Sequence, residues 1–159
     1  MKFRLLTLLI TKLLGVDEEA KKADMHLPEW IAGFGLASIL GGFILVALSI
    51  IGENIPFLIF GIIFFVIAPF ALLCYKNQRI YILSEDEFEY STFLGNKKIY
   101  KFANIKKLRA NKDSMTMFID DGELHKVHIE SSAVMSQRLI DHINKALAEA
   151  RESKKEKKQ

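Results

Sequence analysis

Charge is missing from one long stretch of this sequence. Between positions 30 and 75 the only charged residue is Glu53. On either side of Glu53 lie about as many apolar residues as the roughly 20 that a bilayer-spanning helix needs. The turn Gly52-Glu53-Asn54-Ile55-Pro56 separates the two runs. We therefore predict a transmembrane helical hairpin over residues 30–75, with spans at 31–51 and 55–75.

Other absences narrow the function. Cys74 is the only cysteine, which excludes an intramolecular disulfide and fits a reducing compartment. Neither predicted span contains an internal ionisable residue, which argues against ion translocation by this chain alone. The net charge of +3 is too small to imply nucleic-acid binding, and no nucleic-acid reading motif is present.

Catalytic motifs are also missing. The sequence has no nucleophile elbow, phosphate-binding glycine loop, zinc-protease helix or paired-carboxylate signature. Of the four histidines, His125 and His128 are three positions apart on a predicted strand, so they point to opposite faces. We predict a protein that is not an enzyme, with no catalytic residues, no metal and no cofactor.

Basic residues near the spans predict the orientation. Lys12, Lys21 and Lys22 precede the first span, Lys76 and Arg79 follow the second, and the turn between them has none. Lysine and arginine near span ends stay on the cytoplasmic side. We expect a plasma-membrane protein of bacterial type with two spans and both termini in the cytoplasm.

Residues 1–29 precede the hairpin and divide into two parts. The first is predicted to be an amphipathic interfacial helix. Its apolar face consists of Phe3, Leu6, Leu9, Ile10 and Leu13. The same face would also suit packing against the spans of a partner protein. The second part, residues 17–26, is charged and is expected to be a solvated linker helix.

Small residues recur along the first span. Gly33, Ala37 and Gly41 follow one another at four-residue intervals and would form a narrow face. Its simplest partner is the second span, through Gly61 and Ala68. A separate membrane protein is the alternative.

After position 76 the apolar pattern changes from helical to alternating, which predicts strands joined by tight turns. The candidate strands are 79–83, 87–93, 97–102, 105–111, 115–119 and 124–129. A final amphipathic helix, capped by Ser131 or Ser132, should cover the open end of this sheet. We assign residues 76–150 to one cytoplasmic α+β domain and residues 151–159 to a frayed or disordered basic tail.

Seven basic residues with no acid among them lie in the middle of this domain. They are Lys97, Lys98, Lys101, Lys106, Lys107, Arg109 and Lys112. They could be solvated strand positions, contacts to anionic lipid headgroups, or contacts to an acidic protein partner. Strand alternation would divide them between faces.

Three segments of the domain resemble a known fold. They are Arg79-Ile80-Tyr81-Ile82-Leu83, the run from Lys98 to Leu108, and the Asp121-Gly122 turn before the closing helix. Together they resemble the bacterial pleckstrin-homology-like domains that are fused to a two-span hairpin, of the YcxB-like type. The resemblance implies an antiparallel sheet or partial barrel of about six strands, and a module that binds proteins or membrane surfaces.

These observations lead to one functional hypothesis with two alternatives. We expect a non-enzymatic, membrane-anchored interaction module, an accessory or regulatory subunit of a larger integral membrane protein. One alternative is a sensor of anionic lipid at the membrane surface. The other, which rests on resemblance alone, is self-protection against membrane-active peptides. Membrane lipids are further expected partners, and a homo-oligomer is possible.

Overall fold

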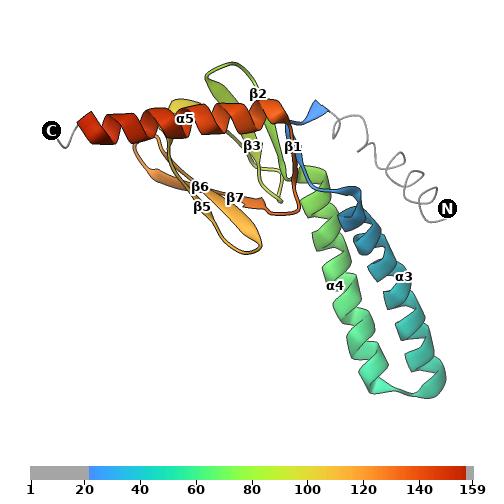
Figure 1. The fold of residues 1–159 in the computed structure, drawn as a ribbon. Helices are drawn as coiled ribbons and strands as arrows, with labels where there is room; N and C mark the ends of the chain where they lie inside the picture. The colour runs from blue at the N-terminus through green and yellow to red at the C-terminus, as the bar shows by residue number, and fades with distance from the viewer. Residues whose placement is uncertain (1–21, 157–159) are drawn as a thin grey trace.

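The structure of the 159-residue chain is a computed structural model, and it describes residues 22–156 (Figure 1). The expected interfacial helix, whose apolar face runs from Phe3 to Leu13, lies outside the described residues. In the described part, a long helical hairpin projects from a β domain that one long helix covers (Figure 1).

The hairpin has the predicted two helices, α3 (Glu29–Gly52) and α4 (Ile55–Asn77). The turn between them is tight. Glu53 adopts the left-handed conformation with φ 50°, and its backbone N–H donates to the Ser49 carbonyl. Asn54 caps α4, because its side-chain oxygen accepts from the Phe57 N–H at 3.4 Å. Pro56 fits beside this cap, since a proline in the first helical turn has no N–H to leave unpaired.

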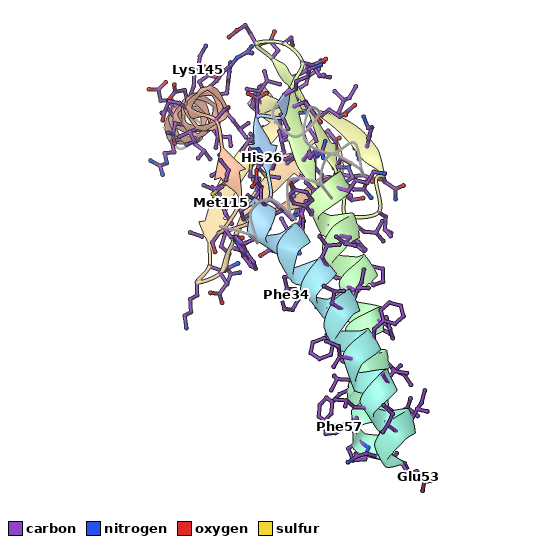
Figure 2. The ribbon with its side chains drawn as sticks, turned by 90° about the vertical axis from the view of Figure 1, so that its right-hand side faces the viewer. His26, Phe34, Glu53, Phe57, Met115 and Lys145 are labelled. Atoms are coloured by element: carbon purple, nitrogen blue, oxygen red, sulfur yellow. The ribbon has the colours of Figure 1, made fainter. Side chains whose placement is uncertain are left out.

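The hairpin leaves most of its apolar surface exposed. Only 22% of the most apolar window of α3 and 11% of that of α4 are buried within the chain. A core helix of a soluble protein would be mostly buried, and exposed apolar surface of this extent is typical of a membrane or protein–protein contact. Both helices are long and apolar enough to span a membrane. Glu53 marks one end of the hairpin and the β domain lies at the other (Figure 2).

All six expected strands are present, and each pairs antiparallel with its neighbour. They are β2 (Arg79–Ile82), β3 (Glu87–Ser91), β4 (Lys97–Lys101), β5 (Ile105–Ala110), β6 (Ser114–Asp120) and β7 (Leu124–Glu130). They belong to two sheets, one of order β4-β3-β2-β1-β8 and one of order β5-β6-β7. The described strands therefore form no closed barrel.

Two short strands of the first sheet were not expected. β1 (Met25–His26) pairs with β2 on one side and with β8 (Val134–Met135) on the other. The prediction of a solvated linker helix up to residue 26 is wrong here, because Met25 is fully buried. Since β1 and β2 are paired, the hairpin is an insertion between two neighbouring strands of one sheet.

The closing helix α5 (Gln137–Glu156) starts later and ends later than expected. Its cap is Ser136, whose Oγ accepts from the Leu139 N–H at 3.1 Å, so the prediction of Ser131 or Ser132 is wrong. The helix also continues through residues 151–156, which were expected to fray. Leu139 and Ile143, on the apolar face of α5, are buried.

The core of the domain lies between the two sheets and α5. Its fully buried residues include Phe88 from β3, Ile105 from β5 and Met117 from β6. The short 3-10 helix η1 (Phe102–Asn104) leads from one sheet to the other and packs beneath α5. Both sheets and α5 therefore contribute to one core.

Candidate interaction surfaces

The contact between α3 and α4 uses small residues on both helices. Gly35 and Gly42 of α3 are buried, as are Gly61 and Ala68 of α4. A methyl group added to Gly61 would lie 2.7 Å from Val46 Cγ2, and one added to Gly42 would lie 3.2 Å from the Gly61 carbonyl oxygen. The two backbones therefore approach as closely as glycine permits.

Gly61 and Ala68 were expected at this contact, but the expected α3 partners were wrong. A methyl group added to Gly33 or Gly41 would meet nothing within 4 Å, and Ala37 is exposed. The face of α3 that meets α4 is shifted by one or two residues, through Gly35, Ser38 and Gly42. The buried Ser38 hydroxyl needs no hydrogen-bond partner from α4, because it donates to the Phe34 carbonyl within its own helix at 2.9 Å.

Gly33, Ala37 and Gly41 consequently form an outer face of α3, turned away from α4. We call these three residues the outer small-residue face. One helix thus carries small residues on two sides, and the hairpin uses only one of them.

The expected basic cluster is divided between two sheets. Lys97, Lys98 and Lys101 lie on β4, an edge strand of the five-stranded sheet. Lys106, Lys107 and Arg109 lie on β5, an edge strand of the three-stranded sheet, and Lys112 lies in the turn that follows. Alternation divides them further, because Lys98 points to the opposite face of β4 from Lys97 and Lys101. The seven residues do not form one continuous patch.

Acidic residues lie beside two of these lysines. Lys97 Nζ is 2.9 Å from Glu89 Oε1 on the neighbouring strand β3. Lys98 Nζ is 2.7 Å from His125 Nε2 and 3.9 Å from Asp121 Oδ2. Asp121 also contacts His125 at 3.0 Å. This group links β4 of one sheet to the β6–β7 hairpin of the other, which indicates a structural role.

No group of three or more histidine, cysteine or acidic side chains could hold a metal ion within residues 22–156. His142 stacks on Phe102 with ring centroids 4.8 Å apart and lies 3.6 Å from Glu85. A wide, open depression of about 460 Å³ lies beside these residues at the start of α5. Its wall mixes acidic and basic side chains, which favours no single class of ligand.

The junction between the hairpin and the β domain was not foreseen. The Asn77 side-chain N–H, at the end of α4, donates to the Phe93 carbonyl at 2.9 Å. The Phe93 ring lies 5.3 Å from the ring of Phe70, two turns back along α4. The β3–β4 turn therefore lies alongside the final part of α4. An apolar pair, Phe93-Leu94, inside an otherwise polar turn was the sequence signal for this contact.

A second part of the junction encloses a histidine. His26 of β1 lies opposite Arg79 of β2. Burial, and then the nearby Arg79 charge, lower the pKa of His26 below 6.5, although Glu29 acts in the other direction. His26 Nδ1 is buried without a hydrogen-bond partner among the described residues. A neutral imidazole suits this position better than a cationic one.

Residues 26–153 match DUF6560, a family of unknown function. The chain belongs to this family. The DUF6560 segment starts within β1 and ends within α5, so it contains the hairpin, both sheets and most of the closing helix. No curated protein and no solved structure gives a match. The family match therefore extends over both the hairpin and the β domain.

Proposed function

We propose that this DUF6560 protein is a non-enzymatic, membrane-anchored interaction module, an accessory or regulatory subunit that binds a larger integral membrane protein. The observation that carries the proposal is the outer small-residue face of α3. Glycine at a lipid-facing position gains no packing, and in a helix it costs about 1 kcal/mol relative to alanine. A second helix that approaches closely at Gly33 and Gly41 would give these residues a function.

The β domain supports the same role. It is held at the end of the spans, so it would lie against the part of the partner protein that projects from the membrane. Two antiparallel sheets with a closing helix are compatible with a pleckstrin-homology-like domain, a type of module that binds other proteins or membrane surfaces. We propose the cytoplasmic side for it, because Lys22 and Lys76 flank the spans at this end.

Adjacent glycines of α3 allow a matched test. Gly41→Leu places a large side chain on the outer face, where there is open space. Gly42→Leu places the same side chain against Phe65 and the Gly61 backbone, inside the hairpin. Each variant is purified at native expression in mild detergent, and the co-purified proteins are identified by mass spectrometry. Thermal unfolding of each purified protein is measured in parallel.

The expected result separates the two faces. Gly41→Leu should lose a stoichiometric membrane-protein partner, and the unfolding temperature of the purified chain should stay at the wild-type value. Gly42→Leu should lower that unfolding temperature. Unchanged partner recovery with Gly41→Leu would contradict the proposal. So would a wild-type complex that contains only copies of this chain.

A further inference from the structure

A small hollow lies where α4 enters the β domain. Its volume is about 120 Å³. It is lined by Lys76, Asn77, Arg79, Tyr81, Ser91, Gly95 and Lys97. These residues come from the end of α4, the strands β2, β3 and β4, and the β3–β4 turn. None of the seven is acidic, and three carry a positive charge.

The three cationic groups come from three elements. Lys76 is exposed on the last turn of α4, and the Lys97 side chain on β4 is 62% exposed. Arg79 on β2 is only 3% exposed, and its Nη1 donates to the Tyr81 hydroxyl at 3.3 Å. The guanidinium is therefore fixed in the wall, while the two lysines can adjust. Such a set suits an anion with several oxygens, phosphate above all.

The β3–β4 turn fixes the depth of the hollow relative to a membrane. Phe93 packs on Phe70, which precedes Asn77 by seven residues and so lies about 10 Å further along α4. Leu94, next to Gly95 of the hollow, is 62% exposed. An apolar tip at this position would be placed among lipids if α4 spans a bilayer, with the lysines above it at headgroup level.

Hydrogen bonds within the turn make that placement favourable. The Gly95 N–H donates to the Thr92 carbonyl at 2.8 Å, and the Thr92 N–H donates to the Asn96 carbonyl at 3.0 Å. The Asn77 side chain, which lies outside the turn, donates a hydrogen bond to the Phe93 carbonyl. Backbone groups near the hydrocarbon must be paired, because no water is available there.

We propose that the hollow binds the phosphate of an anionic phospholipid, in the leaflet that faces the β domain. Lys76, Arg79 and Lys97 surround the phosphate, and Leu94 lies against the lipid's upper acyl chain. The assignment does not use Gly33, Ala37 or Gly41, the outer small-residue face that carries the subunit proposal, so either proposal can fail alone. Glu89, 2.9 Å from Lys97, competes with the phosphate for that lysine and sets a limit on the affinity.

The test uses the full chain in detergent, titrated with phosphatidylglycerol or phosphatidylcholine of equal chain length and observed by native mass spectrometry. Wild-type protein should prefer phosphatidylglycerol. The Lys76→Gln/Lys97→Gln double variant should bind phosphatidylglycerol about 25-fold more weakly, at about fivefold for each lost charge contact. Its binding of phosphatidylcholine should change little. Glu89→Gln should act in the opposite direction and strengthen phosphatidylglycerol binding.

A matched control removes two lysines elsewhere. Lys106→Gln/Lys107→Gln changes the net charge by the same amount on β5, outside the hollow. Equal weakening by this variant would overturn the proposal, since the preference would then reflect overall charge. Unchanged binding by Lys76→Gln/Lys97→Gln would overturn it too. Thermal unfolding confirms folding of every variant, and exposed lysines should leave it unchanged.

A competition experiment identifies the source of the phosphate. Inorganic phosphate and glycerol 1-phosphate are added at increasing concentration to the lipid-bound protein. Leu94→Asn should weaken phosphatidylglycerol binding and leave any binding of inorganic phosphate unchanged. Displacement of the lipid by micromolar inorganic phosphate, with no effect of Leu94→Asn, would overturn the lipid assignment in favour of a soluble phosphate compound.

Discussion

Asp24, just before β1, and Ser136, just before α5, are joined by two hydrogen bonds. The Ser136 hydroxyl donates to Asp24 Oδ1 at 2.9 Å, and the Ser136 N–H donates to the Asp24 carbonyl at 2.7 Å. The second carboxylate oxygen of Asp24 accepts from the Ile82 N–H at 2.9 Å. One side chain before the hairpin thus binds both β2 and the cap of α5. This contact encloses β1 and fixes the position at which the hairpin leaves the domain.

Loss of the Asp24 carboxylate should destabilise the β domain. Asp24→Ala removes two hydrogen bonds to a charged acceptor, and each such bond contributes about 1.5 to 3 kcal/mol. The cap of α5 would lose its support, so the unfolding temperature in detergent should fall by several degrees. Asp86→Ala, in the exposed β2–β3 turn, is the control and should change little. A similar unfolding temperature for both variants would show that the Asp24 contacts add no net stability.

The β domain should fold without the hairpin, but only if β1 is kept. His26 and Arg79 are paired neighbours, so a short Gly-Ser linker can join residue 27 to residue 78. A chain with residues 22–27, the linker and residues 78–159 should be soluble and unfold cooperatively. Residues 78–159 alone lack β1, and Ile80 and Met135 would lose the buried Met25 between them.

Circular dichroism and thermal unfolding of the two fragments check this prediction. A cooperative transition at the same temperature in both would contradict the structural role of β1. Failure of both fragments would show that the domain depends on the spans for its folding.

The orientation across the membrane can be measured directly. We expect a reporter that is active only in the cytoplasm to work when fused after Gln159 and to fail when inserted between Glu53 and Asn54. The reason is the placement of lysine and arginine at the β-domain end of both helices. A second reporter, active only outside the cytoplasm, should give the reverse pattern. Activity of the first reporter at Glu53 would reverse the proposed orientation.

Acidification should destabilise the junction through His26. Its pKa is lowered in the folded chain, chiefly by burial, so the unfolded chain binds a proton more readily between the lowered value and 6.5. The contribution of neutral His26 to the free energy of unfolding is therefore fully present above pH 6.5 and is lost as the pH drops through this window. His26→Gln should reduce that loss, measured as the difference in unfolding temperature between pH 7 and pH 5.5. An unchanged difference would exclude His26 as its source.

Local patterns in the sequence predicted the two long apolar helices and the six main strands. A run of about 20 residues without charge favours a buried or lipid-facing helix, and alternation of apolar and polar residues favours a strand with one buried face. Both signals extend over many residues, so errors of a few residues at the ends of the elements did not change which elements were predicted. The same holds for Gly61 and Ala68, which are small residues in an otherwise bulky span.

Only the tertiary structure decided which surfaces meet. α3 is apolar on every side, so nothing in its own sequence fixes its rotation, and the choice of Gly35 and Gly42 over Gly33 and Gly41 depends on the shape of α4. The two-residue strand β1 is too short to show any period, and its partners lie far along the chain. Ser136 was missed for the same reason, because its choice as cap depends on Asp24, which lies 112 positions away. The hollow at Lys76, Arg79 and Lys97 likewise exists only because inserting the hairpin between β1 and β2 places the end of α4 against the β3–β4 turn.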